Sequence, residues 1–128
     1  MTSSTLHINN ATRYSIPRIA FGDIKDFILG PKYELTINIV SSEEVRKLNK
    51  RYREMDMSTD ILSFPIDERN GEIYFSFDDC EKMRHDFDRD FDNFIAFLFI
   101  HGCTHLIGHD HGRIMDSIEA RAQKKFGI

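Results

Sequence analysis

The sequence predicts an α+β fold: one compact domain over residues 1–128, with a small mixed sheet of about four strands packed with helices around a central buried helix. Three observations lead to this prediction. The length of 128 residues suits a single domain. With 41% hydrophobic residues and 11 Phe, the chain can fill a core. Segments of strand and helix character also mix without the regular alternation of a doubly wound sheet.

The N-terminal third of the chain supplies two strands and a helix. Thr5–Asn10 has the character of an edge strand. A helix is predicted from Pro17 toward Leu29, because proline suits the first helical turn, and it stops at Gly30. Glu34–Val40 alternates in polarity and is predicted as a second strand.

A second helix is predicted over residues 42–53. Ser41 followed three residues later by Glu44 forms a capping box at its start. The apolar residues recur at helical spacing; they are Val45, Leu48 and Tyr52. Asp60–Pro65 and Glu72–Phe77 then form two antiparallel strands, because Asn70 and Gly71 between them signal a turn.

Three helical segments follow the strands. The first is predicted near Asp79–His85. Phe91–Ile107 is apolar on all faces, as expected for a helix buried at the centre of a small fold, and it ends at Gly108. Met115–Phe126 is a final amphipathic helix.

Charge and cysteine content narrow the class of protein. With 17 Lys plus Arg against 21 Asp plus Glu, the net charge is −4, which excludes a histone-like cationic wrapper. Cys80 and Cys103 are too few for a disulfide framework, so we expect free thiols in a reducing compartment. The longest strictly apolar run, Phe94–Ile100, is too short to span a bilayer. The sequence thus predicts a cytoplasmic protein without a membrane partner.

Four of the six histidines lie between residues 101 and 111. His101 and His105 are four apart, a spacing that stacks two imidazoles about 6 Å apart on one helix face. Gly108 lets the chain leave the helix and turn back, so His111 can approach the same ion. A continuous helix would put His109 about 12 Å along the axis from His101, which makes it a poor third ligand.

The predicted metal ligands are therefore His101, His105 and His111. Three neutral nitrogens leave the fourth tetrahedral position of a zinc ion for water, as in catalytic sites, which indicates hydrolysis. One divalent ion, Zn²⁺ by default, is the expected cofactor, although imidazoles also accept Ni²⁺, Cu²⁺ or Fe²⁺. Asp110 could orient a ligand imidazole or cap a turn, and the sequence leaves both open.

The spacing of these histidines is also that of metzincin proteases. In that motif a glutamate directly follows the first histidine and acts as the general base. Here the position is Gly102, which cannot accept a proton. The pattern thus keeps the metal ligands and excludes that route to peptide hydrolysis.

The segment His101–His111, HGCTHLIGHDH, closely resembles the signature HGxLHLxGYDH of the YbeY family, which are bacterial metal-dependent endoribonucleases of ribosomal RNA maturation. It departs at Thr104, which replaces a leucine and is expected to affect packing only, and at His109, which replaces a tyrosine. A second block over residues 49–65, NKRYREMDMSTDILSFP, is similar to the family's arginine-bearing helix end and TDVLSFP strand. The segment Gly71–Ser76, GEIYFS, is similar to its GDIVIS strand.

The resemblance implies RNA as the substrate. It implies cleavage of single-stranded RNA in ribosomal RNA processing, including maturation of the 16S rRNA 3′ end, and in ribosome quality control. The implied partners are ribosomal RNA, the small ribosomal subunit and ribosome-associated proteins. Arg53 and His101 are then the expected catalytic residues, since Arg53 aligns with the arginine implicated in the family's activity and suits bidentate phosphate contact. The C-terminal end of the second predicted helix is basic, starting with Lys47. The expected RNA-binding residues in this helix end are Lys50, Arg51 and Arg53.

Two alternatives stay open at the level of sequence. One is a ribosome-assembly or RNA-binding factor in which the tri-histidine metal is structural. The other is a metal-dependent hydrolase of small phosphoesters or amides. A basic cluster at a helix C-terminus also has a simpler role, because cations there complement the helix dipole.

Overall fold

The computed structural model describes residues 5–108 and 112–128. Four strands in this part of the chain form one sheet in the order β1-β2-β4-β3. They are β1 (Leu6–Asn10), β2 (Glu34–Val40), β3 (Ile61–Asp67) and β4 (Asn70–Ser76). The pairs β1·β2 and β2·β4 are parallel, whereas β3 and β4 are antiparallel. The predicted mixed sheet of an α+β fold is confirmed.

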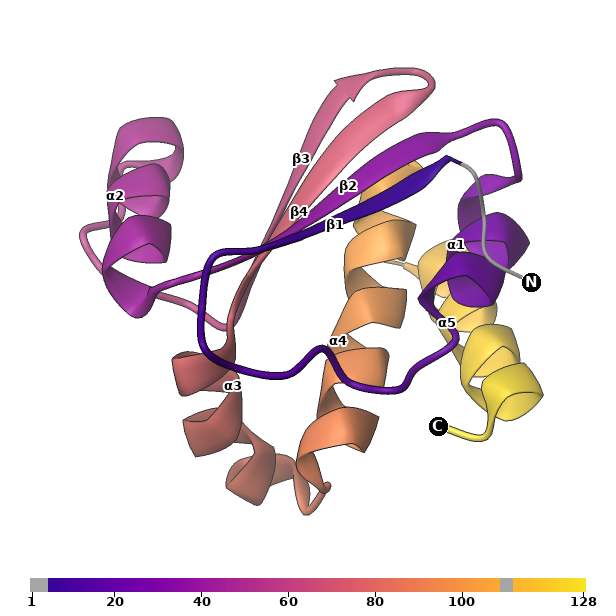
Figure 1. Ribbon diagram of the computed structural model, residues 1–128. Helices are drawn as coiled ribbons and strands as arrows, with labels where there is room; N and C mark the ends of the chain where they lie inside the picture. The colour runs from indigo at the N-terminus through magenta and orange to yellow at the C-terminus, as the bar shows by residue number, and fades with distance from the viewer. Residues whose placement is uncertain (1–4, 109–111) are drawn as a thin grey trace.

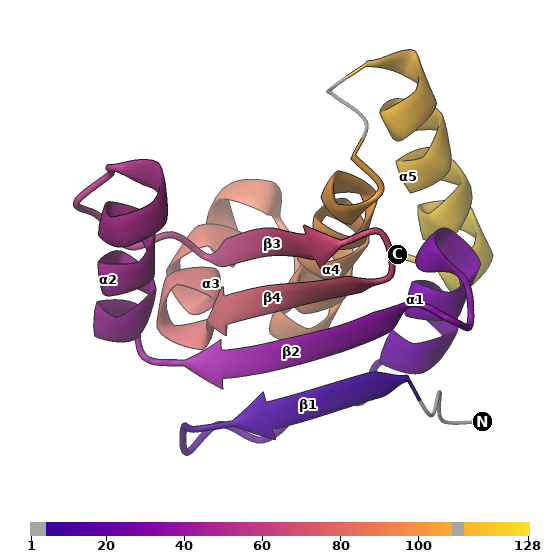
Figure 2. The same ribbon diagram turned by 90° about the horizontal axis from the view of Figure 1, so that it is seen from above.

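The helices cover the sheet unequally. They are α1 (Phe21–Leu29), α2 (Ser42–Arg53), α3 (Phe77–Met83) with a 3₁₀ turn (Arg84–Phe87), α4 (Phe91–Leu106) and α5 (Arg113–Phe126). Figure 1 shows α1, α4 and α5 on one side of the sheet and α2 on the other. Seen from above in Figure 2, α2 stands at one end of the strands and α1 and α5 at the opposite end.

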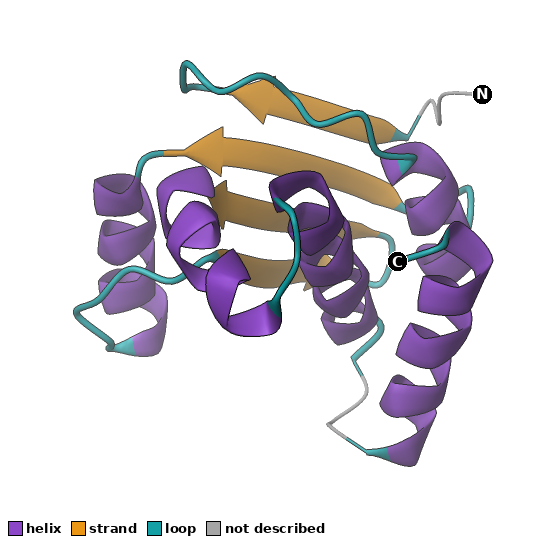
Figure 3. Ribbon diagram, turned by 90° about the horizontal axis from the view of Figure 1, so that it is seen from below, coloured by secondary structure: helices purple, strands orange, loops and turns teal. Residues whose placement is uncertain are grey.

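The core lies between the sheet and α4. Figure 3, from below, shows α4 crossing beneath the strands between α3 and the α1/α5 pair. Most of the 16 residues of α4 are buried, as its uniformly apolar sequence predicts. The strands turn alternate residues toward it, all of them almost fully buried: Leu35, Ile37, Ile39, Ile73 and Phe75. The helix that carries His101 and His105 is thus fixed along most of its length.

Two details of the predicted elements are wrong. The helix expected from Pro17 begins at Phe21, because Ile19 N donates to Pro17 O at 3.0 Å and Phe21 N to Ile19 O at 2.8 Å. These bonds join residues two apart and hold the segment in tight turns instead of a helix.

The expected Asn70–Gly71 turn is also displaced, because both residues belong to β4 and the turn falls at Glu68 and Arg69. The Asp67 carboxylate accepts hydrogen bonds from Arg69 N at 2.8 Å and from Asn70 Nδ2 at 2.9 Å. The aspartate side chain thus closes this turn.

Both cysteines are free, as the sequence predicts, and both are buried. Among the described residues, none of the helices combines the length and the apolar character that crossing a bilayer requires.

Candidate metal centre

His101 and His105 meet at one point near the C-terminal end of α4. Their Nε2 atoms are 2.9 Å apart, and the ring planes are almost perpendicular, at 87°. The one-turn spacing on a helix brings them together, and the burial of α4 holds their backbone in place. Two imidazole nitrogens directed at each other are a suitable pair of donors for a divalent transition metal. The predicted pairing of His101 with His105 therefore fits the donor set of a metal site.

The third predicted ligand, His111, lies outside the described residues, together with His109 and Asp110. Within residues 5–108 and 112–128, no group of three His, Cys, Asp or Glu side chains is arranged to hold a metal ion. The convergence of all three histidines therefore stays a prediction. Gly108, the last described residue before His109, has φ of 88°, a conformation that favours glycine and lets the chain leave the helix as expected.

A glutamate on α5 contacts the back of the first imidazole. Glu119 Oε1 lies 2.7 Å from His101 Nδ1, on the opposite side of the ring from Nε2. The same oxygen is 2.9 Å from the hydroxyl of Thr104. A carboxylate that holds the second nitrogen of an imidazole is a common companion of histidine metal ligands. Sequence reasoning considered only Asp110 for this role and missed Glu119.

A sequence signal for Glu119 exists. Met115 and Ala122 are the buried residues of α5, and Glu119 lies four positions after one and three before the other. It therefore shares the apolar face of an amphipathic helix, where a lone carboxylate needs a polar partner.

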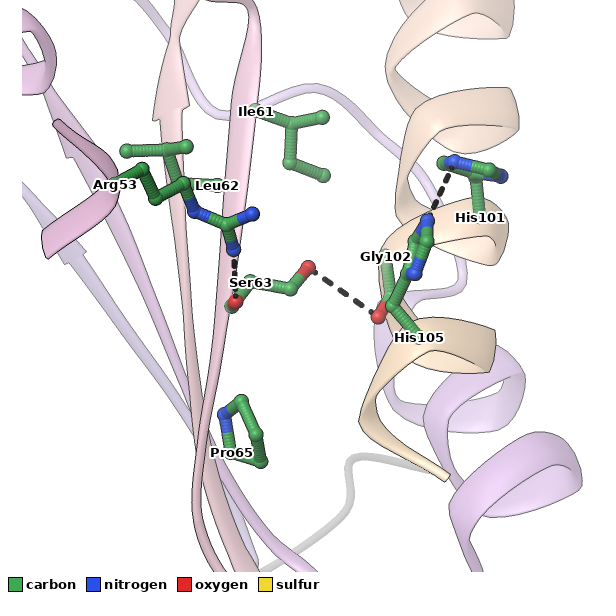
Figure 4. Close-up of a pocket in the computed structure, with 8 residues that line it drawn as sticks. All are labelled: Arg53, Ile61, Leu62, Ser63, Pro65, His101, Gly102 and His105. Carbon is green, nitrogen blue, oxygen red and sulfur yellow. Dashed lines mark hydrogen bonds between the residues drawn. The ribbon is translucent and has the colours of Figure 1, made fainter. Parts of the chain in front are cut away.

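The two imidazoles line a pocket of about 270 Å³ between α4 and the edge strand β3. Figure 4 shows Arg53 entering this pocket from α2, on the side opposite the histidines. Its Nη2 donates to Ser63 O at 2.9 Å, and its Cζ lies 5.5 Å from the centre of the Phe64 ring. The lining residues are Arg53, Ile61, Leu62, Ser63, Pro65, His101, Gly102 and His105. One cavity thus combines the guanidinium of Arg53 with two imidazole nitrogens of the type that bind divalent metals.

The other predicted RNA-binding residues do not line this pocket. Lys50 Nζ lies 4.0 Å from Asp56 Oδ2. The other oxygen of this carboxylate, Oδ1, accepts a 2.8 Å hydrogen bond from Arg46 Nε. The Arg51 guanidinium lies 5.3 Å from the centre of the exposed Tyr52 ring. Both belong to the same helix end as Arg53, but only Arg53 reaches the histidines' cavity.

The packing of α4 against the sheet requires a residue without a side chain at Gly102. A Cβ atom there would lie 2.9 Å from Ile61 Cδ1, 3.1 Å from Ser63 Oγ and 3.2 Å from Ile73 Cδ1. The glycine lets α4 approach β3 and β4 closely, and its carbonyl oxygen accepts a bond from Ser63 Oγ at 3.3 Å. A glutamate side chain has no room at this position, so the metzincin base is excluded by packing as well as by sequence.

Cys103 lies between the two histidines in sequence but takes no part in the pocket. It is fully buried, and that burial raises the pKa of its thiol well above the ordinary value. Its sulfur does not line the pocket, so among the described residues the candidate donors at this site are the two imidazoles.

The family model described as endoribonuclease YbeY matches residues 6–126, which is nearly the whole chain. The chain belongs to the YbeY family. The resemblance based on the three sequence segments is thereby confirmed, and the match also spans the N-terminal third, where none of those segments lies.

Several relatives carry the name endoribonuclease YbeY. The YbeY of Nautilia profundicola is 32% identical over 124 residues, which cover 94% of this chain and 86% of that protein. The YbeY of Oenococcus oeni is 30% identical over 115 residues, covering 80% and 72%. A solution structure from Thermotoga maritima has the same fold, with a TM-score of 0.66 at 24% identity over 95% of this chain and 89% of that one.

Proposed function

We propose that this YbeY chain is a metal-dependent endoribonuclease that hydrolyses phosphodiester bonds of single-stranded RNA in ribosomal RNA processing, as one domain over residues 1–128. The observation that carries the proposal is the shared pocket of His101, His105 and Arg53. The names of its relatives, endoribonuclease YbeY, supply RNA as the substrate. Ribosomal RNA and the small ribosomal subunit are the proposed partners, in keeping with the sequence resemblance.

His101 and His105 would hold the cation, with His111 as the proposed third ligand, and zinc is the proposed metal. A divalent cation held there supplies Lewis acidity toward a phosphoryl oxygen and lowers the pKa of a water molecule. The structure assigns no general base, and Gly102 cannot serve as one.

Arg53 is proposed to bind the scissile phosphate. One of its five N–H groups donates to Ser63 O, which fixes the guanidinium at the pocket, while a planar fork retains donors for a phosphate oxygen pair. Its charge would offset negative charge that develops at phosphorus during cleavage. Lys50 and Arg51 would contact the backbone of the RNA farther from the reacting bond.

The pocket favours hydrolysis over a purely structural metal. A structural zinc site is closed by four protein ligands, whereas the two histidines here face a cavity wide enough for several waters. Arg53 at the same cavity has no role in a structural metal site.

The test is cleavage of a labelled single-stranded RNA by the metal-loaded protein. Removing Arg53 as Arg53→Ala is expected to lower kcat/KM by about 10²–10³-fold, as for loss of a group that stabilises transition-state charge. His105→Ala and a chelator are expected to abolish cleavage, because both remove the metal.

Arg13→Ala is the matched control, because Arg13 is exposed on the segment between β1 and α1 and does not line the pocket. It is expected to cleave as the wild type does. Cleavage by His105→Ala at the wild-type rate would overturn the nuclease proposal. If RNA binding persisted with no cleavage by any form, the RNA-binding factor would be the better description.

A further inference from the structure

Glu119 and Thr104 form a hydrogen-bonded pair behind the first candidate ligand. Glu119 Oε1 lies 2.7 Å from His101 Nδ1 and 2.9 Å from Thr104 Oγ1. An ionised carboxylate has no proton to give, so the imidazole N–H is the donor to Glu119, and the one Thr104 hydroxyl proton is shared between Glu119 Oε1 and the backbone oxygen of His101 at 2.7 Å. One carboxylate oxygen thus contacts both the imidazole and the hydroxyl, and 20% of the Glu119 side chain is exposed.

The contact with Glu119 favours the neutral tautomer of His101 that carries its proton on Nδ1. With the hydrogen on Nδ1, the neutral ring presents a lone pair at Nε2, on the side that faces His105. A metal ligand must present a lone pair, and the hydrogen bond made by the other nitrogen selects that tautomer and ring orientation. Glu119 therefore prepares His101 for a cation.

At Thr104 the chain departs from the family signature. The YbeY signature has a leucine at this position, which cannot donate a hydrogen bond, and the sequence analysis expected an effect on packing only. That expectation is wrong: the Thr104 side chain is completely buried, with its hydroxyl 2.9 Å from Glu119 Oε1 and 2.7 Å from His101 O. Away from water, such a bond fixes the carboxylate more firmly than an exposed one would.

The glutamate is not needed to dock its own helix. Met115 and Ala122 of α5 are buried on either side of it, with 2% and 0% exposure, and Ala122 belongs to the main core cluster. The apolar contacts therefore hold α5 against the core, and replacement of the carboxylate leaves that packing in place.

We propose that Glu119 and Thr104 are positioning residues that fix the tautomer and orientation of His101 and so raise the affinity of the site for a divalent cation. The inference deepens the proposed function, since it assumes that this site binds the metal. Loss of the carboxylate is expected to weaken metal binding by about 10–100-fold, the usual range for such partners. Loss of the Thr104 hydroxyl removes one neutral donor and is expected to cost about 2–10-fold.

The first measurement uses the metal-free protein. Long-range ¹H–¹⁵N correlation of the imidazole rings reports which nitrogen of His101 is protonated. The wild type is expected to hold the proton on Nδ1, and Glu119→Ala to move the neutral ring toward the Nε2–H form. An unchanged His101 spectrum in Glu119→Ala would overturn the proposed tautomer control.

The second measurement is zinc affinity by competition with a chelator. Glu119→Gln keeps an oxygen that accepts from Nδ1–H, so it is expected to recover part of the affinity that Glu119→Ala loses. Thr104→Val keeps the shape of the side chain without its hydroxyl. Asp116→Asn is the matched control, because it removes a carboxylate charge from the exposed first turn of the same helix. It is expected to stay within about twofold of the wild type.

The outcomes separate the two proposals. Equal zinc affinity of wild type and Glu119→Ala would overturn this inference and leave the nuclease proposal standing. A wild type that binds no divalent cation would overturn both. Should Glu119→Ala fold poorly by circular dichroism, the zinc affinities of the wild type, Glu119→Gln and Asp116→Asn are compared instead. A Glu119→Gln affinity equal to that of the wild type and Asp116→Asn would overturn this inference.

Discussion

At the scale of single residues, side chains that line the candidate site are held by contacts with the rest of the protein. Arg53 illustrates this, because its guanidinium donates to a backbone carbonyl of β3 and lies over the Phe64 ring. A side chain with two fixed contacts loses less conformational freedom when a phosphate binds.

Arg53→Lys tests whether the planar fork matters beyond its charge. An ammonium group keeps the charge but cannot hold Ser63 O and a phosphate in the same plane, so we expect kcat/KM for RNA to fall by at least about 10-fold. Zinc affinity is expected to stay unchanged, since lysine does not contact the ligands. Steady-state kinetics and chelator competition give the two values. Full activity of Arg53→Lys would show that charge alone suffices.

Cys80 and Cys103 are expected to be chemically silent in the folded protein. Burial is the main cause that raises the pKa of both thiols, so the folded chain keeps them protonated in mildly alkaline solution. In the unfolded chain they ionise near the ordinary thiol pKa of about 8.5. The unfolded state therefore binds fewer protons above that pH, and the free energy of unfolding is expected to fall as pH rises from about 8.5 to 10.

A chromogenic thiol reagent checks the cysteine prediction. Two thiols per chain are expected to react in denaturant, and neither rapidly under native conditions. Rapid reaction of Cys103 in the folded protein would contradict its buried position beside the histidines.

At the scale of elements, α2 delivers Arg53 to the pocket, and its start is fixed by a side-chain cap. Ser41 Oγ accepts a 3.1 Å hydrogen bond from Glu44 N, as the capping box predicts. We expect Ser41→Ala to lower the free energy of unfolding by about 1 kcal/mol. Urea denaturation measures this, with Ser42→Ala as the neighbouring control. A change no larger than that of the control would mean that the cap contributes little.

The elements that the sequence predicts well have local signals. β2 and α2 have the predicted bounds because alternation and a cap mark them directly, and α4 is identified by its continuous apolar character. The start of α1 was predicted too early, at Pro17. Proline is common at helix starts, but here it is followed by tight turns, and the helix begins at Phe21. Those turns depend on backbone contacts that no side-chain pattern shows.

The candidate site was only partly predictable for a related reason. His101 and His105 are one helical turn apart, so their meeting follows from spacing alone. Glu119 lies 18 residues beyond His101 and reaches it only because α5 packs back against α4. Likewise, the sequence indicates only a packing role for Thr104, because the carboxylate that its buried hydroxyl contacts comes from another helix. A single sequence shows that Glu119 lies on an apolar helix face and needs a polar partner, but it does not show which residue that partner is.

At the scale of the whole molecule, the fold brings three distant parts of the chain to one cavity. α2 contributes Arg53, the edge strand β3 contributes Ser63, and α4 contributes the imidazoles. The sheet and α4 form the rigid part, with α4 buried along most of its length. A cation that binds only the folded chain also stabilises it, by about 2.7 kcal/mol at a free concentration 100 times its Kd.

The central proposal is that His101, His105 and His111 hold one catalytic cation, and metal stoichiometry tests it most directly. Equilibrium dialysis followed by elemental analysis is expected to find one divalent ion per wild-type chain. It is expected to find a large loss in each of the variants His101→Ala, His105→Ala and His111→Ala. An ion that stays bound to all three variants, or a wild type that binds none, would contradict the account.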